Sequence, residues 1–193
     1  FRTDFQDQVL ADLDISPNKI VFYNLAGKSF ANSFQTQLDF IPAKNLELRL
    51  AYKYYDVQAD FAGGKRQIPF MAKNRGFFNA AYTTERNSKG GFWSFDTTLQ
   101  LIGKQKLPNL NSNPAEFRLP EYSDSFATLN AQISRNFNKN IRVYLGGENL
   151  TSYTQNQPIM DANNPFGNYF DGGMVYAPIM PANFYVGVDF SFN

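Results

Sequence analysis

The segment that decides the fold class is Leu46-Glu47-Leu48-Arg49-Leu50-Ala51-Tyr52-Lys53-Tyr54-Tyr55. Leucine and tyrosine occupy every second position, and charged residues fill most of the positions between them. Because successive residues of a β-strand point to opposite faces, this pattern predicts a strand with one apolar and one polar face. The segment is also long enough to cross a bilayer, which takes ~9–11 residues of a tilted strand. It therefore predicts a membrane-spanning strand.

The same period of two recurs along the whole chain and predicts seven further strands, while almost nothing predicts a helix. By residue range these strands are Arg2–Asp14, Ser29–Ile41, Lys73–Thr84, Trp93–Gly103, Ser125–Phe137, Ile141–Leu150 and Asn183–Phe192. Arg135 interrupts the apolar face of its strand, which is acceptable near a membrane boundary, where a charge costs least.

The alternation also assigns side chains to the two faces of the predicted wall. The apolar residues expected to face outward include Phe34, Leu48, Leu50, Phe95, Leu99, Val186 and Phe190. The polar residues expected to face inward are Gln35, Gln37, Asp39, Glu47, Arg49, Asn79, Asp96, Gln100 and Gln132. Aromatic residues near strand ends are expected to form girdles at the membrane interfaces; they are Tyr52, Tyr54, Tyr82, Trp93, Phe137 and Tyr144.

The predicted connections alternate between long and short without exception. The short ones are Pro42–Asn45, Arg86–Phe92 and Asn138–Asn140. The long ones are Ile15–Lys28, Asp56–Ala72, Lys104–Asp124 and Ser152–Pro181. An up-and-down membrane barrel has short periplasmic turns and long outer loops, so it predicts this order. A soluble sandwich gives no physical reason for it.

Composition supports the same fold class and excludes several functions. The chain of 193 residues is 17% aromatic, yet its mean hydropathy is −0.41, as strands with one apolar and one wet face would give. A net charge of +1 offers no basis for nucleic-acid binding, which needs clustered basic residues. Histidine and cysteine are absent, which removes the commonest general base, the commonest zinc ligand and thiol chemistry. We therefore expect no enzyme activity, no catalytic residues, no metal site and no cofactor.

Several motifs resemble those of a known family. The chain ends on the alternating apolar residues Phe184, Val186, Val188, Phe190 and Phe192, followed by Asn193. This ending resembles the C-terminal assembly signal of outer-membrane barrels. The stretch Gly146-Gly147-Glu148-Asn149-Leu150-Thr151-Ser152-Tyr153 resembles the "ENL…Y" motif in the penultimate strand of TonB-dependent receptors. Three shorter stretches also resemble this family: Phe1–Gln6, Phe22–Leu25 and Leu119–Tyr122.

The resemblance implies an all-β, antiparallel, up-and-down transmembrane barrel of about 22 strands, of which this chain would form the last eight. The chain opens in strand-like sequence without an initiator Met or a signal peptide, so we expect a plug domain and earlier strands upstream. The implied location is the bacterial outer membrane. The implied partners are the lipid bilayer, the protein's own plug and upstream strands, TonB through the N-terminal part, a small-molecule nutrient and a surface lipoprotein.

The implied function is active uptake of a scarce nutrient, such as a metal chelate, cobalamin, haem or an oligosaccharide. The inward polar residues would then face the plug. Aromatic residues in the two longest loops have no lipid face to cover, so they either pack the loops into ordered lids or line a ligand vestibule. With polar neighbours they give the candidate substrate contacts Arg118, Tyr122, Tyr153, Gln155, Asn156, Tyr169 and Tyr176.

Two other functions stay open at this point. A self-contained eight-stranded structural or adhesive barrel requires the first and last strands to pair with each other, because unpaired backbone groups are costly in hydrocarbon. A passive porin predicts a charged constriction loop, and none of the loops carries an acidic cluster.

Overall fold

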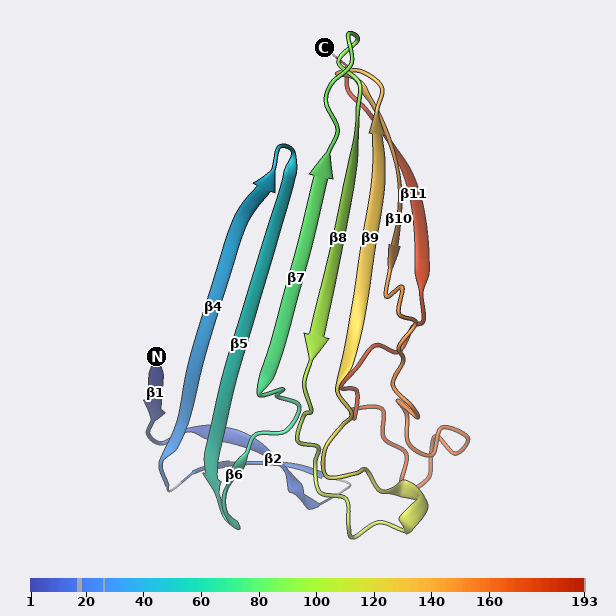
Figure 1. Cartoon of the computed structure of the whole chain (residues 1–193). Helices are drawn as coiled ribbons and strands as arrows, with labels where there is room; N and C mark the ends of the chain where they lie inside the picture. The colour runs from blue at the N-terminus through green and yellow to red at the C-terminus, as the bar shows by residue number, and fades with distance from the viewer. Residues whose placement is uncertain (17–18, 26, 193) are drawn as a thin grey trace.

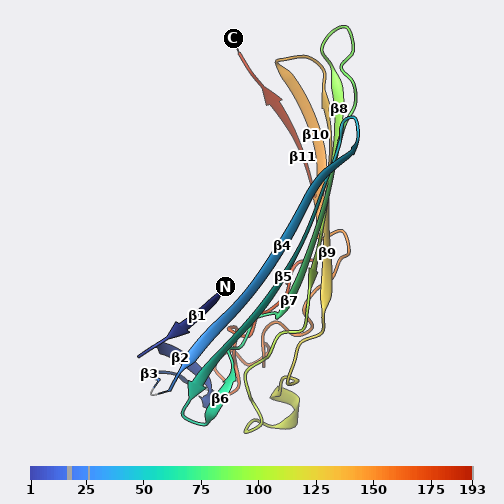
Figure 2. The same ribbon diagram turned by 60° about the vertical axis from the view of Figure 1, so that its left-hand side comes forward.

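The computed structural model describes residues 1–16, 19–25 and 27–192 of the chain. Its main feature is one antiparallel sheet that stands as a tall, curved wall, with short turns at one end and long loops at the other (Figures 1 and 2). In spatial order its strands are β1 (Arg2–Phe5), β4 (Ser29–Ala43), β5 (Leu46–Phe61), β7 (Asn74–Thr83), β8 (Phe92–Ile102), β9 (Phe126–Asn136), β10 (Ile141–Glu148) and β11 (Asn183–Phe190).

The predicted fold class is confirmed, since neighbouring strands of the wall are connected in the up-and-down order that the alternation predicts. From Ser29 onward every predicted strand is present, with ends displaced by a few residues. Among the described residues the helical structure is confined to the single 3-10 turn η1 (Ala115–Phe117). No helix in this part of the chain is long and apolar enough to span a membrane.

The predicted first strand, Arg2–Asp14, is wrong beyond Phe5. The backbone turns at Asp7, whose φ of 50° lies in the left-handed region. β2 (Val9–Ser16) then leaves the wall and pairs with β3 (Lys19–Asn24) as a separate two-stranded sheet. On this hairpin Leu10 and Tyr23 pack inward, whereas Val9 and Ile15 of the apolar alternation are exposed. β3 lies inside the predicted loop Ile15–Lys28.

The predicted loop Asp56–Ala72 also contains strand structure. β5 continues through it to Phe61 and pairs with β6 (Gly64–Gln67). The extension is stable because Val57, Ala59 and Phe61 are buried along one side of it. The wall therefore extends as a hairpin beyond the short strand that the sequence predicts.

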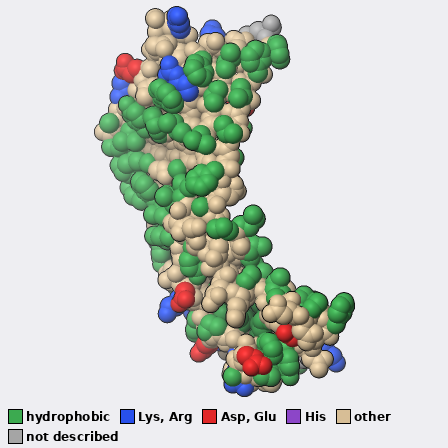
Figure 3. Space-filling model, turned by 90° about the vertical axis from the view of Figure 1, so that its right-hand side faces the viewer, with side chains coloured by type: hydrophobic (Ala, Val, Ile, Leu, Met, Phe, Trp, Pro, Cys, Tyr) green, Lys and Arg blue, Asp and Glu red, His purple; other side chains and the backbone are tan. Residues whose placement is uncertain are grey.

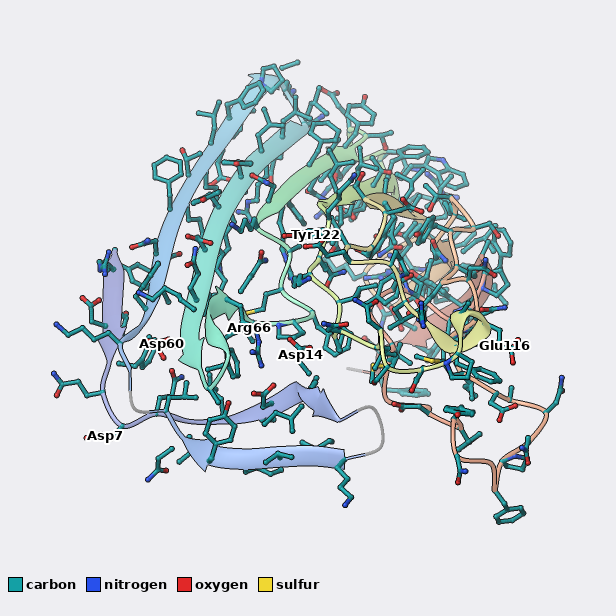
Figure 4. The ribbon with its side chains drawn as sticks, turned by 90° about the horizontal axis from the view of Figure 1, so that it is seen from below. Asp7, Asp14, Asp60, Arg66, Glu116 and Tyr122 are labelled. Atoms are coloured by element: carbon teal, nitrogen blue, oxygen red, sulfur yellow. The ribbon has the colours of Figure 1, made fainter. Side chains whose placement is uncertain are left out.

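Cross-strand pairing places the predicted polar residues on one common face. Asp39 lies opposite Arg49, which in turn lies opposite Asn79. Asp96 lies opposite Gln132. Directly opposite residues of antiparallel strands point to the same side of the sheet, so these rows share a face. It is the face onto which the β2–β3 hairpin packs, and Figure 4 shows that hairpin lying across the concave side of the wall.

The opposite, convex face exposes large apolar side chains. Phe34 is 57% exposed, Phe95 41% and Val186 74%, which a water-facing surface does not tolerate over so large an area. Figure 3 shows charged side chains at the two ends of the molecule and a band without them in between. This band is what a wall embedded in hydrocarbon requires.

Tyr144 was predicted to belong to an aromatic girdle on the outer face, but it lies on the concave face. Tyr144 is opposite Gly187 and its ring lies over that glycine, 6.2 Å from the ring of Tyr185 in an edge-on arrangement. Tyr185 in turn donates to Gln132 on the concave face. Tyr144 lies on this face because Gly187 has no side chain, and the neighbouring tyrosine ring covers the bare backbone there.

Both edges of the wall are unpaired among the described residues. β1 pairs with β4 alone, and β11 pairs with β10 alone. β1 and β11 lie at opposite edges of the sheet and form no ladder with each other. The sheet is therefore open.

Candidate functional site

The long loops gather at one end of the wall, together with the β2–β3 hairpin and β6 (Figure 1). The hairpin is attached through an apolar cluster in which Leu25, Ala59 and Phe61 are buried and Leu10 and Tyr23 pack around them. The tyrosine hydroxyl also accepts a hydrogen bond from the backbone of Ala62 at 3.0 Å. The hairpin is thus docked onto the concave face of β5.

Ionic contacts hold the same face of the hairpin. The Arg66 guanidinium on β6 bonds to the buried Asp12 carboxylate and contacts Asp14 at 3.0 Å. Figure 4 shows Arg66 and Asp14 pointing toward one another across the gap between β6 and the hairpin. Asp14 also accepts a hydrogen bond from the backbone of Asn109 at 2.7 Å, which brings the β8–β9 loop into the network. We call Asp12, Asp14 and Arg66 the hairpin latch.

The environment of Asp12 favours its charged form. Burial by itself raises the pKa of this carboxyl, but hydrogen bonds from the Tyr23 hydroxyl, the Asp14 N–H and the Arg66 guanidinium outweigh it, so that the pKa lies below its ordinary value. The Tyr23 hydroxyl donates at 2.6 Å, and its own pKa is raised by burial and by the carboxylate beside it. The latch is therefore ionic at neutral pH.

The two longest loops pack together rather than standing free. Leu110 of the β8–β9 loop is buried against Met160 and Met174 of the β10–β11 loop, with Phe117 and Phe70 around them. Among the predicted substrate contacts, Tyr169 stacks on Phe117 and Tyr153 stacks on Phe126, each at 4.8 Å between ring centroids. Tyr176 is half-buried, and its carbonyl accepts from Gln105 at 2.9 Å. These aromatic residues act as packing elements of an ordered loop assembly.

Gln155 is buried, and both atoms of its amide group are engaged by the backbone of the same loop. It is 4% exposed, and its Nε2 donates to the carbonyl of Met174 at 2.8 Å. Its Oε1 accepts from the N–H groups of Tyr176 at 2.8 Å and Ala177 at 3.2 Å. In this structure Gln155 fixes the return of the loop.

The predicted contacts that remain accessible are Arg118, Tyr122 and Asn156. The Arg118 Nε donates to the carbonyl of Asn113 at 2.6 Å, and the Tyr122 ring lies 5.2 Å from the Lys106 ammonium. A hollow of about 360 Å³ lies beside Tyr122; its lining residues are Gln67, Lys73, Asn74, Lys104 and Tyr122. Of the predicted residues, Tyr122 alone lines this hollow.

Asn149 is a residue of the loop assembly that sequence reasoning missed. It has a φ of 48°, and its Nδ2 donates to the carbonyls of Tyr153 at 2.8 Å and Met180 at 2.9 Å. The two carbonyls belong to the start and the end of the β10–β11 loop, so one amide closes the loop at its base. The signal was present, since asparagine adopts the left-handed conformation more readily than other residues with side chains.

A pair of basic residues on the concave face of the wall is a second feature that was not predicted. Lys53 and Arg75 lie directly opposite each other, and no carboxylate forms an ion pair with either within the described residues. Like charges in this position destabilise a sheet unless a counter-charge is supplied. They line a hollow of about 200 Å³ with Gln35, Phe77 and Gln100. Arg49 lies four residues before Lys53 on the same face. Its charge, by contrast, is neutralised by Asp39, which lies directly opposite it.

Other predicted residues lie where the register puts them. Phe184, Val186, Val188 and Phe190 project from the convex face of β11, and Phe192 follows the strand, 87% exposed. Their role as an assembly signal stays a prediction, as does the contact of the polar face with a plug. In the described part of the chain no group of three or more acidic, His or Cys residues is placed to hold a metal ion.

Comparison with known proteins agrees with the fold. A family model described as "TonB dependent receptor-like, beta-barrel" matches residues 1–150. A search among curated proteins found no match to this chain. The matched region covers most of the wall, the β2–β3 hairpin and the β8–β9 loop. Members of this family are transporters of the bacterial outer membrane rather than enzymes. The chain therefore belongs to the TonB-dependent receptor β-barrel family.

Proposed function

We propose that this chain is the C-terminal wall of a TonB-dependent transporter that actively takes up a scarce, negatively charged nutrient. We infer the negative charge of the solute from Lys53 and Arg75. These two residues lie opposite each other on the concave face, without a counter-ion among the described residues. An anionic group passing this wall would supply the missing charge. Gln35 and Gln100 add hydrogen-bond partners beside it.

The loop assembly supplies the outer binding surface in this proposal. Arg118, Tyr122 and Asn156 are the exposed side chains that would meet the solute first. The open sheet fits a wall whose edges pair with further strands of the same barrel, since unpaired backbone groups are costly in hydrocarbon. In this proposal a plug domain and TonB complete the transporter. A surface lipoprotein is a further partner, which would contact the outer loops.

Uptake by cells that carry the intact transporter tests the proposal. A panel of ferric chelates, haem, cobalamin and oligosaccharides, including anionic and neutral chelates of matched size, is offered with and without a protonophore. We expect accumulation of an anionic member that the protonophore abolishes, while binding at the surface persists. Replacing both Lys53 and Arg75 with Gln should reduce the uptake rate.

Three outcomes would contradict the proposal. Entry that is insensitive to the protonophore and depends on solute size would indicate a porin. Adhesion without uptake would indicate a structural barrel. Unchanged uptake in the double variant, together with lower stability, would mean that a carboxylate of the plug occupies the cation pair.

A further inference from the structure

A shallow apolar groove crosses the convex face of the wall. Its floor is one row of small side chains in which Ala80 is opposite Thr97, Thr97 is opposite Ala131, and Ala131 is opposite Gly147. Larger residues border the row; they are Tyr82, Phe95, Ile133, Leu145, Leu150 and Phe184. The groove has a volume of about 490 Å³, within the range of small-molecule sites. The strands that carry its floor, β7 to β10, are paired on both sides, so further strands would extend the sheet and would not cover the floor.

A cation stands at the end of this groove that faces the short turns. Arg135 is on β9, four residues from Ala131 and on the same face, because Trp93, its direct partner, is an outward-facing residue. Its guanidinium lies over the rings of Trp93 at 5.1 Å and Phe137 at 5.7 Å. Among the described residues no carboxylate pairs with it. An arginine on the lipid face thus presents its charge at the membrane boundary.

The distance along β9 from Arg135 to the groove is similar to the length of an acyl chain in one leaflet. Four residues of strand cover about 13 Å, and half of the hydrocarbon core is about 15 Å thick. A phosphate held at Arg135 would therefore place an acyl chain along Ile133 and into the groove over Ala131. Exposed Arg86, Lys89 and Lys139 in the neighbouring short turns add positive charge at the same end of the wall.

We propose that this face binds an anionic glycerophospholipid of the leaflet that the short turns meet. Its phosphate contacts Arg135, and one acyl chain lies in the groove over Ala80, Thr97, Ala131 and Gly147. The two aromatic rings flank the headgroup and keep the guanidinium in place. The site is independent of the transported solute.

Native mass spectrometry of the intact outer-membrane protein in detergent tests the site. Phosphatidylglycerol is titrated, with phosphatidylcholine of the same acyl chains as the headgroup control. Arg135→Gln removes the charge, and Ala131→Leu fills the groove without changing charge. Arg135→Gln should weaken the apparent affinity for phosphatidylglycerol about fivefold, the effect expected for one basic contact with an anionic lipid. Ala131→Leu should weaken it as well, because the leucine side chain occupies the space of the acyl chain.

Matched controls lie outside the proposed site. Lys19→Gln removes an exposed charge on β3, at the loop end of the molecule. Thr36→Leu adds an outward-facing leucine on β4. Both variants should bind phosphatidylglycerol nearly as the parent protein does. Heat-modifiable electrophoretic mobility verifies that each variant is folded, and Ala131→Val is the smaller increment if leucine prevents folding. Unchanged affinity in either site variant, equal loss in the controls, or equal binding of the two lipids would overturn the proposal.

Discussion

Asn149 combines a backbone conformation and a side-chain contact that few residues can supply together. The strand β10 ends there, the chain turns through a left-handed φ, and the amide then reaches both ends of the following loop. The N–H of Asn149 also donates a hydrogen bond to the Oδ1 of Asn130 at 2.9 Å. A motif that resembles a family signature in the sequence therefore has a mechanical role at the base of the outer loops.

Substitution of Asn149 separates these two contributions. Asn149→Gly keeps the left-handed conformation and loses the amide, so we expect a loss of about 1–2 kcal/mol for two hydrogen bonds. Asn149→Ala loses the amide and also adds backbone strain of about 1 kcal/mol. Urea unfolding in lipid vesicles should rank the parent protein above the glycine variant and the glycine variant above alanine. Equal stability of all three would show that the loop base is held elsewhere.

Asp12 makes the hairpin latch sensitive to acid. Its pKa is lowered in the folded protein, so its stabilising contribution is complete above the unfolded pKa of about 4 and is lost as the pH falls through the lower, folded pKa. Asp12→Asn leaves Arg66 without its buried partner and should loosen the hairpin at neutral pH. Hydrogen exchange of β2 and β3 reports both effects, with the exposed Asp7→Asn as a control. Exchange in the Asp12 variant that matches the parent protein would refute the latch.

At the scale of elements, period-two alternation predicts a strand wherever one side of it faces lipid and the other faces water. This is why β4, β5 and β7 through β11 could be located, and why Leu50 and Gln37 could be assigned to faces. The same signal cannot tell which partner a strand chooses. Val9–Ser16 alternates as well as the wall does, yet it pairs with β3, because the left-handed turn at Asp7 directs it away. Roles of loop residues such as Gln155 depend on contacts with distant segments, which no local pattern encodes.

The two faces of β4 and β5 should respond differently to one added charge. Leu50→Arg places a guanidinium in hydrocarbon and should cost ~2–4 kcal/mol near the bilayer midplane. Gln37→Arg, opposite Ala51 on the concave face, should cost far less. Refolding titrations in vesicles measure both free energies. Equal costs would mean that the faces are inverted.

At the scale of the whole molecule, an open curved wall with unpaired edges supports the proposal that further strands complete the barrel. β1 and β11 are at opposite edges, and each has one side without a partner among the described residues. The concave face is polar and holds the hairpin, whereas the convex face is apolar across the band that Figure 3 shows. Both features fit a segment of a wide barrel better than a small barrel closed by its own eight strands.

Cysteine cross-linking distinguishes these two architectures. The chain has no cysteine of its own, so a pair introduced at Arg2 and Val188, which both lie on the convex face, gives a clean signal. In a closed eight-stranded barrel the edges β1 and β11 would be neighbours and a disulfide could form. In the intact membrane-embedded protein we expect none. The pair Asp4→Cys and Phe30→Cys, at directly opposite positions of β1 and β4, is the positive control. Oxidation that joins residues 2 and 188 would favour the closed small barrel.

The docking of the β2–β3 hairpin has a consequence for local stability. The hairpin leaves the wall at Phe5 and the chain rejoins it at Ser29, and these two residues are cross-strand partners. Detachment of the hairpin would therefore leave the ladders from β4 to β11 intact. It would break the latch, the cluster around Leu25 and the hydrogen bonds that join Tyr23 to Ala62 and Asp14 to Asn109. The hairpin and the wall are thus two units of different local stability, and we expect the amides of β2 and β3 to exchange with solvent before those of β7 and β8.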